Sequence, residues 1–131
     1  MTRLAQTADL TDIQQEILLT VRTFVDKEII PHANALEHAD AYPTDIVDGM
    51  KEMGLFGLTI PEEYGGVGGD YVTYAIGMEE LGLADSALRG IVSVSSGLVG
   101  KSILYFGTEE QKQQYLPRLA RAEILGCFGL T

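Results

Sequence analysis

An arginine and a serine, Arg89 and Ser93, form the polar pair in this sequence whose types and spacing are best suited to hold a ligand. Residues four apart are neighbours on a helix, so both side chains lie on one face, beside Gly90 and Gly97. A guanidinium group presents a planar fork of donors that matches a carboxylate. The pair therefore indicates an anion-binding group at the end of a pocket. The alternative is a surface ion pair between Arg89 and Asp85, and the residues alone leave both interpretations open.

Other residue types with catalytic or metal-binding chemistry do not form a recognisable site. His32 and His38 lie six apart around Pro31, a spacing that does not place both rings on one helical face. Cys127 is the only cysteine, so it has neither a disulfide partner nor an indicated histidine partner. The glycine-rich run 65–69 lacks the preceding strand and the following lysine of a phosphate loop. We predict no metal site and no catalytic residue in this chain.

Composition and charge exclude several functional classes. The 131 residues are 46% hydrophobic and 21% charged, which is typical of one globular domain. The 19 acidic and 9 basic residues give a net charge of −10, which opposes nucleic-acid binding. The longest charge-free stretch of the C-terminal half, 90–100, is shorter than a membrane span, and the N-terminus lacks the apolar region of a signal peptide. We expect a cytoplasmic protein with no nucleic-acid or membrane partner.

The hydrophobic spacing predicts helices at the positions that must carry these residues. Threonine and glutamine three apart form a capping box at Thr11–Gln14 and again at Thr108–Gln111. The first helix is expected to bend at Pro31 and to end before residue 42. We expect the glycine-rich segment 55–70 to be an ordered loop with a packing role. The predicted fold is an all-α bundle of about five helices, the later ones at about 44–53, 71–83, 86–106 and 109–122.

Two features of the C-terminal half stand out. Small residues recur at positions 90, 93, 97 and 100 of the predicted fourth helix, so one face has little side-chain bulk. This face suits either close packing of another helix or the wall of a ligand cavity. The tail 124–131 is apolar and typical of a strand, but nothing upstream offers a partner strand. We therefore expect the complete protein to continue beyond it.

Three segments closely resemble the N-terminal helical domain of the acyl-CoA dehydrogenase family. They are IPEEYGG at 60–66, GTEEQKQQYLPRL at 107–119 and GCFGLT at 126–131. The resemblance covers nearly the whole chain. It implies a helical domain over residues 1–122 and the first strand of a truncated middle β-domain over residues 123–131. Family members also have a C-terminal four-helix bundle and assemble as homotetramers or dimers.

The resemblance implies an FAD-dependent enzyme that oxidises acyl-CoA thioesters to 2-enoyl-CoA. In the family a glutamate of the C-terminal domain removes the α-proton, and nothing in this chain corresponds to it. The chain alone is therefore expected to be inactive. The implied partners are the acyl-CoA substrate, the remaining domains of the same enzyme, further copies of it, and electron-transfer flavoprotein or a similar acceptor.

The resemblance also assigns roles to individual residues. The run 88–99 is most similar to the glutaryl-CoA dehydrogenase branch, in which residues at the positions of Arg89 and Ser93 hold the distal carboxylate of the substrate. The alternatives are a short- or branched-chain acyl-CoA dehydrogenase, and a non-catalytic helical interaction module. The implied flavin contacts are Phe128, Leu130 and Thr131, and the implied wall of the acyl pocket is Gly90, Ile91, Val94, Ser95 and Leu98.

Overall fold

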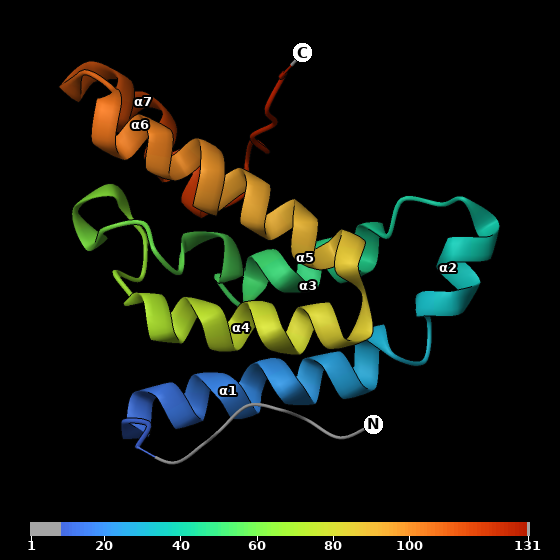
Figure 1. Cartoon of the computed structure of the whole chain (residues 1–131). Coiled ribbons are helices and arrows are strands. Elements are labelled where there is room, and N and C mark those ends of the chain that lie inside the picture. The colour runs from blue at the N-terminus through green and yellow to red at the C-terminus, as the bar shows by residue number, and fades with distance from the viewer. Residues whose placement is uncertain (1–8, 131) are drawn as a thin grey trace.

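The computed structural model describes residues 9–130, and this part of the chain is all-helical (Figure 1). Ser86–Phe106 is one continuous helix, although its middle is wound as a π-helix. No strand occurs among the described residues, so the predicted all-α class is confirmed. The helices are α1 (Asp12–Phe24), ending in the π-helical turn η1 (Val25–Ile29), α2 (Ala33–Ala39), α3 (Thr44–Glu52), α4 (Tyr71–Ala84), the long helix made of α5 (Ser86–Val92), η4 (Ser93–Gly100) and α6 (Lys101–Phe106), and α7 (Glu109–Ala120).

Short-range signals in the sequence set most helix ends. The hydroxyl of Thr11 accepts a bond from the Gln14 amide at 3.2 Å, while the Gln14 side chain accepts one from the Thr11 amide at 3.0 Å. Thr108 and Gln111 form the same reciprocal box at the start of α7. The carboxylate of Asp70 accepts from the amide of the third residue of α4 at 2.8 Å. Each bond satisfies an amide that a helix start leaves unpaired, and the predicted starts are confirmed.

The chain near Pro31 departs from the prediction. The first helix ends in the π-helical turn η1, where the Ile30 amide donates to the carbonyl of Val25. The chain then turns, and α2 extends from the bundle as a separate helix (Figure 1). Proline has no amide donor, so the helical hydrogen-bond pattern is interrupted at Pro31. The expected single bent helix was therefore wrong, and the described residues contain six helices rather than five.

The main core gathers buried side chains from the first helix, α3, the start of the loop, α4 and α5. Helices α1 and α4 run side by side (Figure 1). Helix α4 occupies the middle, with Ile76, Met78 and Leu81 buried. The buried carboxylate of Glu80 accepts two bonds from the guanidinium of Arg22, at 3.1 and 2.7 Å, and ties α4 to α1. Burial on both sides of α4 confirms the expectation of a central helix.

The loop 55–70 packs into the interior of the domain. It contains two short 3₁₀ turns, η2 (Leu55–Gly57) and η3 (Glu62–Tyr64), and joins two apolar clusters. Leu58 belongs to the main core, whereas Ile60 and Tyr64 pack with α7. A Cβ on Gly66 would overlap the carbonyl of Ile60, so the backbone can fold back here only with glycine at this position. The predicted packing role is confirmed.

The long helix differs from one expectation. By length and composition alone, its 21 residues could cross a membrane, although the charge-free stretch is shorter. The sequence-based expectation that no helix could span a membrane is therefore not met when helix length and composition are the only criteria. A core helix of a folded domain passes the same test. Here Ser95, Ser96 and Lys101 bind groups of this same chain.

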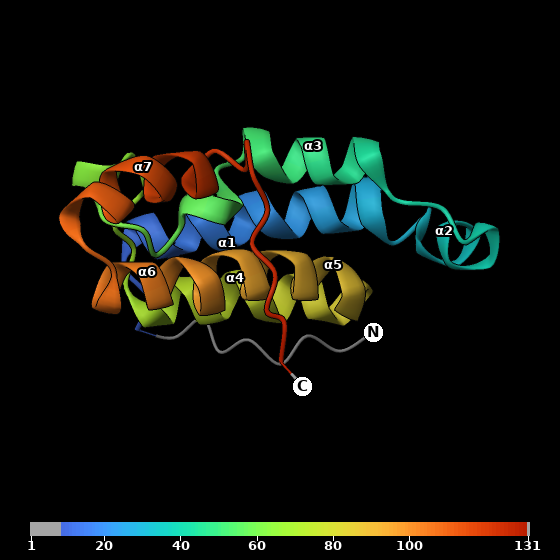
Figure 2. The ribbon, with the colours of Figure 1, turned by 90° about the horizontal axis from the view of Figure 1, so that it is seen from above.

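The tail after α7 has no regular secondary structure over residues 125–130. It crosses the long helix and then projects from the bundle (Figures 1 and 2). Ile124 packs against the cluster formed by the loop and α7, whereas the residues beyond Gly126 are exposed. The expected first strand is absent from the described tail, since no other strand is present to pair with it. The division into domains at residue 122 stays a prediction.

Candidate functional site

Arg89 lies on the long helix and extends toward α4. Its Cδ atom is 3.0 Å from the position that a Cβ on Gly82 would take, so the side chain passes over this glycine. Its positive charge also reaches Tyr74. Burial raises the pKa of the Tyr74 hydroxyl, and the charge of Arg89 opposes that rise. The guanidinium group is thus directed along the boundary between the two helices.

The surface ion pair considered as the alternative for Arg89 is not formed. Asp85 is the N-cap of the long helix, and one of its carboxylate oxygens accepts from the amides of Ala87 and Leu88, at 2.7 and 2.9 Å. Within residues 9–130, Arg89 has no ion pair with any carboxylate. A half-buried guanidinium without a carboxylate partner keeps its donors for an anionic ligand.

Four of the proposed substrate residues lie at the partly open surface of the long helix. A Cβ on Gly90 would meet no atom within 4 Å. Val94 is half-buried, and 44% of Leu98 is exposed, so an apolar stripe runs along the helix at four-residue spacing. The hydroxyl of Ser93 donates to the Gly90 carbonyl at 3.3 Å, a long bond that leaves its oxygen open to a further donor.

The other two proposed wall residues face elsewhere. Ile91 packs against the main core and lines a hollow of about 440 Å³ beside α2, together with Tyr42. Ser95 is completely buried. The structure therefore does not bring all the residues of the implied wall to one surface. Ser95 lies six positions after Arg89, about 9 Å along the helix axis.

Ser95 binds the tail. Its hydroxyl oxygen accepts a hydrogen bond of 3.1 Å from the Gly126 amide. A Cβ on Gly126 would lie 2.6 Å from the Cβ of Val99, so the tail backbone rests directly on the long helix. Two contacts one turn apart on the helix thus fix the point at which the tail crosses it.

The proposed flavin contacts follow immediately after this crossing. Phe128 and Leu130 are 54% and 83% exposed. No backbone hydrogen bond joins residues 127–130 to the rest of the described chain, so their amides and carbonyls are available. Exposed apolar side chains next to free backbone groups suit a planar ring that also forms hydrogen bonds. Thr131 lies outside the described residues.

Sequence reasoning missed the polar groups that fix the C-terminal half of the long helix. The hydroxyl of Ser96 donates to the carbonyl of Phe56, and both atoms are buried. The ammonium of Lys101 donates to the Thr59 carbonyl at 3.0 Å. It also lies over the rings of Tyr71 and Tyr105, whose hydroxyls are 2.9 Å apart. The available signal was two adjacent serines in an otherwise apolar helix, since a buried hydroxyl needs a partner.

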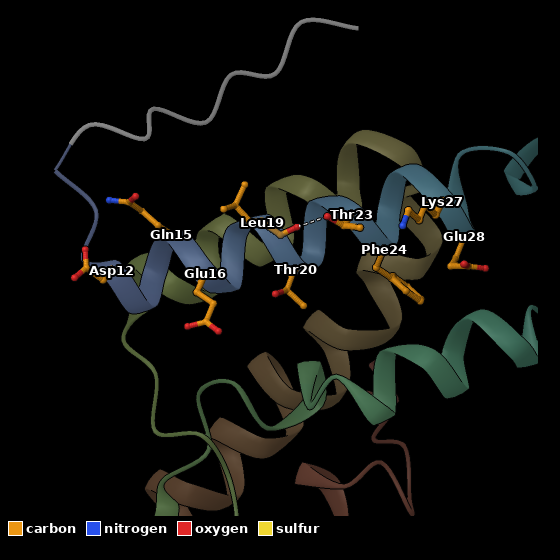
Figure 3. A pocket seen from close by; sticks show the side chains of 9 residues that line it. All are labelled: Asp12, Gln15, Glu16, Leu19, Thr20, Thr23, Phe24, Lys27 and Glu28. Atoms are coloured by element: carbon orange, nitrogen blue, oxygen red, sulfur yellow. Dashed lines mark hydrogen bonds between the residues drawn. The ribbon is translucent and has the colours of Figure 1, made fainter.

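One larger surface hollow is a poor alternative. This hollow, of about 720 Å³, runs along the first helix, and its side chains project from that helix alone (Figure 3). The hydroxyl of Thr23 there donates to the Leu19 carbonyl, within the same helix. A ligand site normally gathers polar groups from several elements. Among residues 9–130, no cluster of three or more histidine, cysteine or acidic side chains could hold a metal ion.

Comparisons with known proteins agree on one family. Residues 11–123 match the family described as "Acyl-CoA dehydrogenase, N-terminal domain". A Bacillus subtilis protein named a probable acyl-CoA dehydrogenase is 42% identical over 123 residues, which are 94% of this chain and 32% of that protein. The chain thus spans about a third of the length of that relative.

Two solved structures share the fold. Butyryl-CoA dehydrogenase from Megasphaera elsdenii has a TM-score of 0.87 and 34% identity, covering 96% of this chain and 34% of its own. A glutaryl-CoA dehydrogenase from Mycobacterium smegmatis, in complex with FADH2, has a TM-score of 0.85 and 36% identity, covering 93% and 31%. The family match and the helical fold lead to one conclusion: the chain belongs to the acyl-CoA dehydrogenase family, as an N-terminal domain of it.

Proposed function

We propose that this chain is the N-terminal domain of an FAD-dependent acyl-CoA dehydrogenase that oxidises an acyl-CoA to its 2-enoyl-CoA. The observation that carries this proposal is the crossing of the tail at Ser95. It places exposed Phe128 and Leu130 just beyond the helix that carries the open stripe and Arg89. When bound, FAD would supply the acceptor for the hydride.

The residues of this chain bind and orient. Val94 and Leu98 offer an apolar surface to the acyl chain. Phe128 and Leu130 cover part of the flavin, and Thr131 adds a hydroxyl there. The α-proton is removed by a glutamate outside this chain. Holding the two reactants in position is the contribution of this domain to the rate.

The proposed substrate is a dicarboxylyl-CoA of the size of glutaryl-CoA. Its support is the half-buried Arg89, which has no ion pair within the described residues, together with Ser93 four residues away. A guanidinium that faced only an apolar acyl chain would be desolvated without compensation. The second candidate is a short-chain acyl-CoA, since butyryl-CoA dehydrogenase shares the fold at a similar identity.

The proposed assembly and location follow from the same features. Exposed apolar side chains such as Phe106, Phe128 and Leu130 suit contacts with the remaining domains and with further copies in a dimer or tetramer. Electron-transfer flavoprotein or a similar acceptor would reoxidise the flavin. The single free cysteine suits a cytoplasmic location.

The test is to express the complete protein and to add acyl-CoA to it without oxygen. A yellow protein whose visible absorbance bleaches with acyl-CoA supports the proposal. The 131-residue chain alone should hold no flavin and turn over no substrate. A complete protein without flavin, or turnover by the chain alone, would contradict it.

A further inference from the structure

We propose that Ser95 is a positioning residue for the flavin: it holds the tail, residues 123–130, at the point from which Phe128 and Leu130 reach the cofactor. The inference rests on the proposed function. It changes the role of Ser95 from a residue of the acyl wall to a residue that acts through the tail.

Ser95 is buried, although it was expected in the wall of a pocket. Its side chain is completely inaccessible, so it cannot line an open pocket. Its hydroxyl accepts the Gly126 amide at 3.1 Å. The amide of Gly126 is partly buried, and leaving it without an acceptor would cost free energy, so this bond helps to determine where the tail lies.

The tail fits closely against the long helix at Gly126. Gly126 has no Cβ, and one built there would lie within 2.8 Å of three side-chain atoms of Val99. The tail therefore has two independent constraints at one residue, a hydrogen bond and a close backbone approach. Beyond it, residues 127–130 have no backbone bond to the described chain, so this contact is the last fixed point before Phe128.

The long helix anchors two different segments at this point. Ser95 and Ser96 are adjacent and almost completely buried, yet their hydroxyls serve different segments, the tail and Phe56 at the start of the loop. Both lie in the π-helical segment η4, and π-helical turns occur frequently at functional sites. One turn of helix thus anchors the loop on one side and the tail on the other.

Ser96→Ala is the matched control for Ser95→Ala. Each substitution removes one buried hydroxyl from the same turn, but only Ser95 contacts the tail. In the complete protein, Ser95→Ala should raise the dissociation constant of FAD about fivefold, the usual effect of one hydrogen bond. It should also speed amide exchange in the peptide 124–131 and shift the visible absorption band of bound flavin. Ser96→Ala should leave all three readouts unchanged.

Gly126→Ala gives a second route to the same contact. The added methyl group meets Val99 and displaces the tail, while Ser95 and its helix stay intact. It should reproduce the effects of Ser95→Ala on FAD affinity and exchange, and it decides the question if Ser95→Ala does not fold.

The outcomes separate the two proposals. If the wild-type complete protein binds no FAD, the proposed function fails and the flavin role of Ser95 fails with it. If the wild-type complete protein binds FAD, the proposed function stands. If Ser95→Ala and Gly126→Ala then bind FAD as tightly as the control Ser96→Ala does, the positioning role is overturned. Faster exchange of the tail without weaker FAD binding would likewise overturn it, since the tail contact would then be structural only.

Discussion

The two halves of the long helix have similar compositions and different surroundings. In the first part of the helix, residues 86–94, Gly90 faces open space and Arg89 has no ion pair within the described residues; we call this part the open half. In the second part, residues 95–106, Ser95, Ser96 and Lys101 each bind a backbone group of another segment; we call this part the closed half. Small and polar residues therefore leave an open surface in one half and mark close packing within the chain in the other.

The glycines show the same difference. A Cβ on Gly97 would lie 2.8 Å from the hydroxyl of Tyr74, and one on Gly100 would approach Ile60 at 3.8 Å. A Cβ on Gly90 would meet no side chain and no other segment within 4 Å. The close-packing interpretation of the small-residue face therefore applies at Gly97 and Gly100. Near Gly90 the face is open, and its role as a ligand wall stays a prediction.

The largest expected effect is the loss of activity on substitution of Arg89 in the open half. In the complete enzyme, Arg89→Ala should lower kcat/KM for glutaryl-CoA by about 30-fold or more, because losing the partner of a buried carboxylate costs about 2–5 kcal/mol. For butyryl-CoA, kcat/KM should change little or rise. The measurement is the ratio of the two values in wild type and variant. An unchanged ratio would contradict the proposal that the substrate is a dicarboxylyl-CoA and would favour a short-chain acyl-CoA.

The next largest effect is the loss of stability on substitution of Lys101 in the closed half. Lys101→Met should lower the free energy of unfolding of the domain by about 1.5–3 kcal/mol, because it removes a charge-assisted bond to the Thr59 carbonyl and a contact with two tyrosine rings. Lys51→Met is the control. Lys51 pairs with Asp48 at the surface, and such a pair is worth about 0–1 kcal/mol. Equal losses in denaturant titrations would show that Lys101 does not fix this half.

The glycine comparison predicts effects of opposite sign. Gly97→Ala should destabilise the domain by about 1–2 kcal/mol, since the methyl group meets the Tyr74 hydroxyl. Gly90→Ala should stabilise it by about 0.5–1 kcal/mol, because alanine favours a helix and the space is open. Thermal unfolding of both variants measures the difference. Adding Tyr74→Phe should relieve the cost of Gly97→Ala, and destabilisation by Gly90→Ala would contradict the open wall.

Local signals made most of the fold predictable. Thr11, Asp70 and Thr108 cap the helices that they were expected to cap, because a capping bond joins residues three positions apart. Gly54 ends α3 with a φ of 72°, a conformation that glycine adopts at little cost. Pro31 was harder, because proline disrupts a helix without fixing the direction that the chain takes next.

The site was less predictable, because its contacts are non-local. The sequence placed Arg89 and Ser93 on one helix face, but it could not show that Asp85 would cap the helix rather than pair with Arg89. Ser95 meets Gly126 across 31 positions of sequence. Helical spacing predicts on which face of a helix a residue lies, but not which segment packs against that face. The buried position of Ser95 under the tail could therefore be seen only in the structure.

The smallest expected effect is the pH dependence of the closed half. Tyr71 and Tyr105 share a hydrogen bond of 2.9 Å beside Lys101. This bond, the charge of Tyr71 when ionised, and burial raise the pKa of Tyr105 above its usual value of 10.0. A raised pKa in the folded state means that the neutral form is the stabilised one. The contribution is thus fully present below about pH 10 and is lost as the pH rises through the higher pKa of the folded protein.

The measurement is the melting temperature of the domain between pH 8 and pH 11, for wild type and for Tyr105→Phe. The variant lacks the titrating hydroxyl, so wild type should lose slightly more stability than the variant above about pH 10. Tyr71→Phe removes the other half of the same bond and should behave like Tyr105→Phe. Both variants keep Lys101, so the difference reports on the tyrosine pair. Parallel curves for all three proteins would show that this exposed pair adds nothing to the closed half, and that Lys101 and the two serines hold it alone.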